Sequence, residues 1–142
     1  MNKIYSTWHE FFGQFDDKIT GAKVAAYPMG FAWERDKAGD RFVAPRFPYI
    51  TYPVVRPGFL QNTLISVHIF DKHEAQPGYL AKVAYIQGQM EELIGLGINL
   101  RVEGTNYRIA PGSPFFPTPL PEPNDSLVVH GIVNLLIRDR TF

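Results

Sequence analysis

The stretch from Asn62 to Asp71, NTLISVHIFD, constrains the fold more than any other part of this sequence. Most of its residues are β-branched or aromatic, which favours an extended strand. Side chains alternate across a strand, so one face carries Ile65, Val67 and Ile69, and the other carries Leu64, Ser66, His68 and Phe70. Both faces hold apolar side chains, and we therefore expect a central strand of a sheet with one face only partly covered.

Two stretches show the spacing of amphipathic helices. Apolar residues recur at helical intervals over residues 3–15, and again over residues 79–94, where Gly95 and Gly97 follow. The acidic side chains of Asp16 and Asp17 are unfavourable at the carbonyl end of the dipole of the first helix. An earlier end of that helix, at Gly13, is therefore the alternative.

Shorter apolar runs bounded by proline, glycine or polar residues indicate further strands. Prolines at both limits of one of them suggest an edge or strand-terminal position. Glu103 to Asn106, EGTN, reads as the turn of a β-hairpin, and Gly131 interrupts the last strand. The expected strands are 23–27, 49–52, 98–102, 107–110 and 127–137.

The order of helix, strands, helix, strands indicates an α+β fold. A chain of 142 residues is short enough for one domain, which we expect to span 1–142. It contains no cysteine, and 14 basic side chains balance 14 acidic ones, so neither disulfides nor a global positive field for nucleic acid is expected. The sequence also shows no signal peptide and no apolar run long enough to span a membrane.

Two segments read as exposed arms. Residues 31–46 are rich in charge, and six of the twelve prolines fall within residues 111–125, where regular ladder pairing is not expected. Exposed aromatic side chains on loops usually mark contacts, although such rings can also pack back on the parent sheet. The candidate contact residues are Phe31, Trp33, Arg35, Arg46, Phe115, Phe116 and Leu120, and Arg138 and Arg140 form a candidate basic pair.

Sequence motifs of the common enzyme classes are absent. His68, Asp71 and His73 are the nearest approach to a metal-binding cluster, but in a regular strand His68 and Asp71 point to opposite faces. We therefore assign no catalytic residue, no metal ligand and no cofactor, and a small metal-dependent enzyme is the less favoured alternative.

The order of these elements resembles the tail terminator, or tail-completion, proteins of long-tailed bacteriophages and prophages. The resemblance rests on APRFPYITYPV from Ala44, on TLISVHIFDK at Thr63 to Lys72, on VAYIQGQMEELIG in the second helix and on a last strand with a short charged tail. The proline-rich segment before that strand is longer and more aromatic than the family pattern.

The resemblance implies a single mixed or antiparallel sheet with both helices on one face, assembled as a hexameric ring. Such a ring stops polymerisation of the tail tube and provides the surface on which the head docks. Its partners would be other copies of the chain, the tail tube protein and a head–neck connector, without a membrane. DNA would pass without specific binding, with Arg138 and Arg140 facing the lumen.

The implied location is the head-proximal end of the virion tail, after synthesis in the cytoplasm of the host bacterium. A head–tail joining or stopper protein, or a minor capsid protein of the neck, is the alternative within viral assembly.

Overall fold

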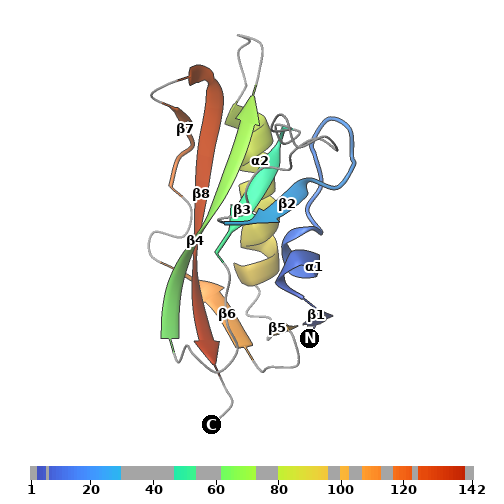
Figure 1. Ribbon diagram of the computed structural model, residues 1–142, viewed down its shortest axis with the longest axis vertical. Coiled ribbons are helices and arrows are strands. Elements are labelled where there is room, and N and C mark those ends of the chain that lie inside the picture. Colours follow the sequence, from blue (N-terminus) through green and yellow to red (C-terminus); the bar gives the residue numbers. More distant parts are fainter. Residues whose placement is uncertain are drawn as a thin grey trace, which may run out of the picture.

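The computed structural model describes residues 3–5, 7–29, 47–53, 62–72, 80–95, 100–102, 107–112, 117–122 and 125–139. It shows an α+β fold (Figure 1). Neither of the helices in these ranges is long and apolar enough to cross a membrane. The elements in chain order are β1 (Lys3–Tyr5), α1 (Trp8–Phe12), β2 (Ala25–Pro28), β3 (Tyr49–Tyr52), β4 (Asn62–Lys72), α2 (Leu80–Gly95), β5 (Leu100–Val102), β6 (Tyr107–Pro111), β7 (Leu120–Glu122) and β8 (Asp125–Asp139).

The main sheet is mixed and six-stranded, in the order β2-β3-β4-β8-β6, with β7 also paired to β8. Its β2 and β3 are parallel, and the other pairs are antiparallel. The longest pairing joins β4 to β8, from Asn62 opposite Arg138 to Lys72 opposite Val128. The prediction that β4 is central is confirmed. β3 is also internal, and its flanking prolines stand at its ends.

A second, two-stranded sheet forms between β1 and β5, which run parallel. The expectation of a single sheet is therefore wrong. So is the hairpin between the strands on either side of residues 103–106, because β5 pairs with β1 while β6 pairs with β8. The β6 pairing places Ile109 opposite Ile137, and both side chains are buried. The chain forms β5 by parallel pairing with the N-terminal β1, and β6 becomes the edge of the main sheet.

The predicted N-terminal helix over residues 3–15 is wrong in extent, since α1 covers only Trp8–Phe12. Thr7 caps the helix: its side-chain oxygen accepts a hydrogen bond from the Glu10 backbone N–H at 3.0 Å. Gly13 ends the helix, which is the earlier of the two expected limits. The aromatic residues that suggested a longer helix are nevertheless buried, because Phe15 packs edge-on against Phe11 from outside the helix.

The remaining predicted elements are close to the observed ones. The helix α2 and the strand β8 match within two residues at each end, and β8 continues through Gly131 without interruption. The proline-rich segment was expected to pair with no strand, yet it contributes β7. An edge strand tolerates proline where its nitrogen faces away from the neighbouring strand, and β7 has a register irregularity at Pro121.

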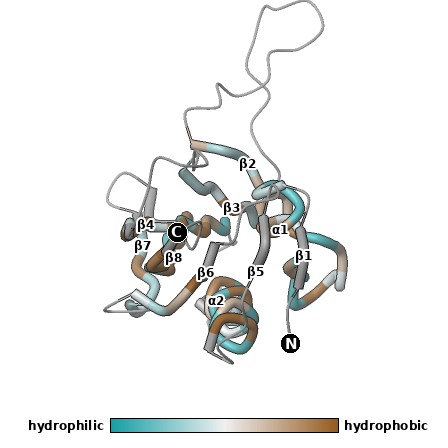
Figure 2. The backbone as a smooth tube through the Cα atoms, turned by 90° about the horizontal axis from the view of Figure 1, so that it is seen from below, coloured by the Kyte–Doolittle hydropathy of each residue, from teal (hydrophilic) through white to brown (hydrophobic). Residues whose placement is uncertain are grey.

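The hydrophobic core contains side chains from both helices and from alternating positions of β4 and β8. Its aromatic part lies at α1, where Phe12 stacks on Tyr52 of β3 with ring centroids 4.6 Å apart. α1 lies beside β1 and β2, and α2 lies beside β6 (Figure 2). Gly131 lets α2 approach β8, because a Cβ atom there would lie 2.3 Å from Val83 Cγ1.

A turn over residues 15–24 connects α1 to β2. The Asp17 carboxylate accepts the Ile19 N–H at 2.8 Å, and Gly21 adopts a left-handed backbone with φ of 69°. Gln89 of α2 then binds the turn through both halves of its amide: its oxygen accepts the Asp16 N–H at 3.0 Å, and its nitrogen donates to the Asp16 carbonyl at 2.9 Å. The turn is thus fixed to α2 by side-chain hydrogen bonds.

Candidate functional site

Most of the contact residues predicted from the sequence lie outside the described residues. Leu120 is an exception: it lies in β7, opposite His130 of β8, and 65% of it is exposed. Arg138 occupies β8 opposite Asn62 and Arg108, but its side chain is outside the described part of the structure. The predicted contact residues outside the described ranges are Phe31, Trp33, Arg35, Arg46, Phe115, Phe116 and Arg140.

The structure does not bring His68 and Asp71 together as metal ligands. Asp71 lies opposite Val129 on the buried side of β4, whereas His68 is on the other side, as the strand geometry predicts. The third member of the proposed cluster, His73, is outside the described residues. Within the described ranges, no three histidine or carboxylate side chains are grouped so that they could hold a metal ion.

The two faces of the β4–β8 pair differ sharply in exposure. The inner face is buried, with Ile65 its most exposed core side chain on β4 at 7%. The outer face is half-buried for most of its length, and Leu64 is 57% exposed. We define the outer face as Leu64, Ser66, His68 and Phe70 of β4 together with His130, Ile132, Asn134 and Leu136 of β8.

A row of aromatic rings crosses four strands on this side of the sheet, with its first pair edge to face and the next two pairs stacked. Tyr27 of β2 contacts Tyr49 of β3 at a centroid distance of 6.3 Å, and Tyr49 stacks on Phe70 at 5.2 Å. Phe70 then stacks on His130 at 4.4 Å. The sheet register produces this row, because Tyr49 and His130 both lie directly opposite Phe70. Each such cross-strand pair stabilises the sheet, and the half-buried rings of Phe70 and His130 lie within the outer face, whereas Tyr49 is buried.

Two histidines meet within the outer face. His68 Nδ1 and His130 Nε2 are 2.6 Å apart, so one nitrogen carries the proton and donates while the other accepts. Protons on both facing nitrogens would break this bond. Nearby, the Ser66 hydroxyl donates to the Asn134 side-chain oxygen at 2.7 Å. These polar side chains therefore cross-link β4 and β8, which holds the outer face in one arrangement.

A hollow of about 740 Å³ lies beside the 15–24 turn, lined in part by Lys23, Lys82 and Tyr27. One of its two lysines already belongs to the turn: the Lys23 ammonium is 2.8 Å from an Asp16 carboxylate oxygen and donates to the Gln14 carbonyl at 2.9 Å. This use of the charged groups is structural, so the outer face is the stronger functional candidate.

The row of rings and the histidine pair are not predicted from the sequence. Their members come from strands far apart in sequence, and their meeting depends on the register between strands. One signal was present: the alternation in β4 places His68 and Phe70 on the partly covered face. The same alternation in the predicted last strand places His130 with Ile132 and Asn134.

A comparison with protein-family models, curated proteins and solved structures gives no match to this chain.

Proposed function

We propose that this chain is a structural subunit of the virion of a long-tailed bacteriophage or prophage. In this proposal it is a tail terminator, which caps the tail tube as a hexameric ring and provides the docking surface for the head. The observation that carries the proposal is the outer face, an apolar and aromatic surface with an exposed leucine at one end, Leu64 opposite Leu136, and another beside its other end, Leu120 opposite His130. Surfaces of this kind are typical of protein–protein contacts.

We further propose that both helices cover the inner face and leave the outer face for assembly. The composition of the core supports this arrangement. Phe11 and Phe12 of α1, and Val83 and Ile86 of α2, belong to the same buried cluster as the inner-face residues of β4 and β8. In such a subunit the inner face of the sheet is buried in the hydrophobic core, and the outer face can contact partners.

The polar groups of the outer face favour assembly over catalysis. The His68 and His130 nitrogens bind each other, and Ser66 binds Asn134. A nucleophile needs a neighbouring base aimed at a substrate position, whereas these bonds join strand to strand. The proposed role requires shape and register from these side chains, and no chemical step.

In the proposed assembly the ring contacts the tail tube protein on one side and a head–neck connector on the other. DNA passes through without specific binding, in keeping with a formal net charge of +0. The ring stands at the head-proximal end of the tail.

Sedimentation velocity over a wide concentration range, with negative-stain images of the heaviest species, tests the proposal. A hexameric ring is the expected result. Discrete dimers that do not grow with concentration would contradict it, because a dimer that is closed on itself leaves no surface for a ring.

The alternative in the same class is a head–tail joining protein, which would bind the portal side. Gold labelling of particles separates the two. A terminator is present on tails assembled without heads, whereas a joining protein is present on heads assembled without tails.

A further inference from the structure

We infer that His68 of β4 and His130 of β8 together bind one divalent ion of the nickel, copper and zinc group. The ion joins the two strands at the centre of the main sheet. Imidazole nitrogen is a preferred ligand of these metals. The site lies within one chain, so it does not depend on the proposed ring.

The strand register brings the two histidines together. His68 lies opposite Ile132 and His130 lies opposite Phe70, so the two histidines are diagonal neighbours on the outer face. Their facing atoms, His68 Nδ1 and His130 Nε2, are 2.6 Å apart. Two ligands that each lie about 2.0–2.1 Å from one tetrahedral zinc ion are about 3.3 Å from each other. A small outward rotation of either ring therefore makes room for an ion between the two nitrogens.

The proton between the two rings can move when the ion binds. A neutral imidazole carries one proton, on either of its ring nitrogens, and a metal ion binds the nitrogen that has none. The ring that donates the hydrogen bond must therefore carry its proton on its other nitrogen in the metal-bound form. This change is a tautomer shift, in which the neutral pair loses no proton.

A neighbouring ring holds the pair in position. Phe70 stacks on His130 with a centroid distance of 4.4 Å and on His68 with a centroid distance of 6.3 Å. The two imidazole rings are inclined to each other by 33°, with their centroids 4.8 Å apart. Ligands that are already adjacent lose little conformational freedom when an ion binds, which favours affinity.

The coordination sphere is completed from the solvent side. Both histidines are half-buried on the outer face, so each keeps part of its surface exposed. Two protein ligands are fewer than the three or four of most zinc sites, and water occupies the remaining positions. We therefore expect weaker binding than at a closed structural zinc site.

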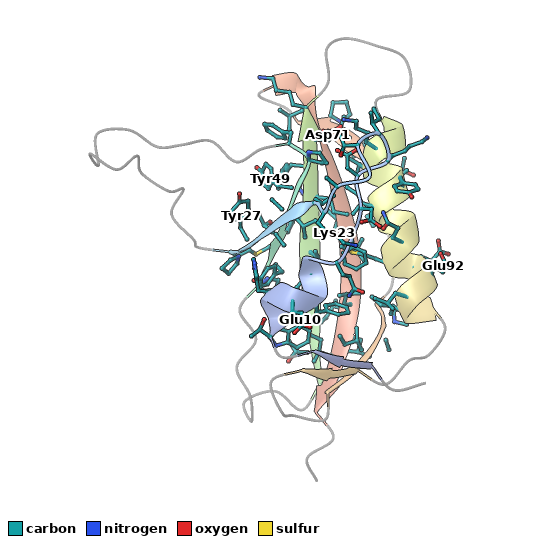
Figure 3. The ribbon with its side chains drawn as sticks, turned by 90° about the vertical axis from the view of Figure 1, so that its right-hand side faces the viewer. Glu10, Lys23, Tyr27, Tyr49, Asp71 and Glu92 are labelled. Carbon is teal, nitrogen blue, oxygen red and sulfur yellow. The ribbon has the colours of Figure 1, made fainter. Side chains whose placement is uncertain are left out.

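The acidic side chain of β4 does not belong to this site. Asp71 is 1% exposed, on the inner side of the strand. Figure 3 shows Asp71 toward α2, whereas Tyr49 of the aromatic row lies on the opposite side of the sheet. The cross-strand pair is thus different from the group of His68, Asp71 and His73 considered from the sequence, and substitution of His73 separates the two.

The ion is expected to stabilise the fold. His68 and His130 are 62 residues apart in sequence, and pairing of β4 with β8 brings them together. An ion that binds the folded chain in preference to the unfolded chain raises the free energy of unfolding. Zinc should therefore raise the melting temperature.

Calorimetric titration of the full chain with zinc chloride tests the site. The chain contains four histidines, so four variants cover every imidazole. His68→Gln and His130→Gln change the site, and His9→Gln and His73→Gln are the matched controls. Thermal melting without zinc first establishes which variants are folded.

The unmodified chain is expected to bind one zinc ion. His68→Gln and His130→Gln should each weaken binding at least about tenfold, because loss of even an outer-shell partner of a metal ligand costs that much. His9→Gln and His73→Gln should bind zinc as the unmodified chain does. Zinc should raise the melting temperature of the unmodified chain and of both controls, and it should have little effect on the two site variants.

Three results would overturn the inference. The first is no binding to the unmodified chain at up to about 1 mM zinc. The second is loss of binding in His73→Gln but not in His130→Gln, which would assign the ion to the group considered from the sequence. The third is one ion per two chains with zinc-dependent dimers in sedimentation velocity, which would place the ion between two copies.

Nuclear magnetic resonance of the unmodified chain with isotopically labelled histidine nitrogens covers the case in which a site variant does not fold. Zinc is expected to shift an Nδ1 resonance of one ring and an Nε2 resonance of another, as the facing atoms His68 Nδ1 and His130 Nε2 predict. Spectra of His9→Gln and His73→Gln identify the other two rings. Shifts confined to the rings of His9 and His73 would contradict the site.

Discussion

At the residue scale, we expect glycine-to-alanine substitution to have opposite effects on stability at two positions, Gly131 of β8 and Gly88 of α2. Gly131→Ala places a Cβ atom 2.3 Å from Val83 Cγ1, and we expect the free energy of unfolding to fall by about 1–3 kcal/mol. Gly88→Ala meets no atom within 4 Å, and we expect the free energy of unfolding to rise by up to about 1 kcal/mol. Urea unfolding of the two variants measures both changes.

A double variant provides the control. Val83→Ala removes the methyl groups that the new Cβ would meet, so Val83→Ala with Gly131→Ala should lose less stability than the two single losses combined. Strict additivity would show that α2 does not approach β8 at Gly131.

The histidine pair gives a second prediction for single residues. His68→Ala and His130→Ala each remove one partner of the 2.6 Å hydrogen bond, and each also removes a ring stacked on Phe70, with centroid distances of 6.3 Å for His68 and 4.4 Å for His130. A double-mutant cycle over the two positions should therefore give a coupling free energy of about 1 kcal/mol. A matched cycle between His68 and His9, which instead binds the Tyr52 hydroxyl, should give no coupling.

At the element scale, Gln89 holds the 15–24 turn against α2 through two hydrogen bonds to Asp16. Gln89→Ala should lower the free energy of unfolding by about 1–2 kcal/mol, because a backbone donor and a backbone acceptor lose their partner. Hydrogen exchange should accelerate at the Asp16 amide, which then lacks an acceptor. Glu92→Ala, an exposed substitution in the same helix, should leave that exchange rate unchanged.

The length of an element decides how well its sequence predicts it. The sequence predicts β4, α2 and β8 closely because their apolar periodicity continues over ten residues or more. It does not predict β1, since three residues carry no period, and although it predicts a strand at β5 it does not predict that β5 pairs with β1 across the chain. The aromatic residues at 8, 11, 12 and 15 fit a helical stripe, yet a short capped helix followed by a turn buries them equally well.

At the scale of the whole molecule, the sequence predicts the existence of a partly covered sheet face but not its contents. Leu64, Ser66, His68 and Phe70 are assigned to that face by alternation alone. The row from Tyr27 to His130 additionally requires the order β2-β3-β4-β8 and the register of each pair. Both are set by tertiary packing, which a local pattern does not encode. The candidate arms at 31–46 and 111–125 stay predictions, except that part of the second forms β7, and the contact role of Leu120 also stays a prediction.

The proposed division of the sheet into an inner face for folding and an outer face for assembly predicts opposite outcomes for two positions of β4 that point to opposite faces. Ile69 is fully buried, and Ile69→Ala should lower the free energy of unfolding by about 2–5 kcal/mol through the cavity that it leaves. Leu64 is 57% exposed, and Leu64→Ser should change the free energy of unfolding by less than about 1 kcal/mol.

The effects on assembly, measured by sedimentation velocity, should be the reverse of those on stability. Leu64→Ser shifts the distribution toward monomer, whereas Ile69→Ala assembles normally below its melting temperature. Equal assembly by Leu64→Ser and the unmodified chain would show that this part of the outer face contributes to the fold alone, because exposed apolar surface that binds a neighbour must lose affinity when it becomes polar.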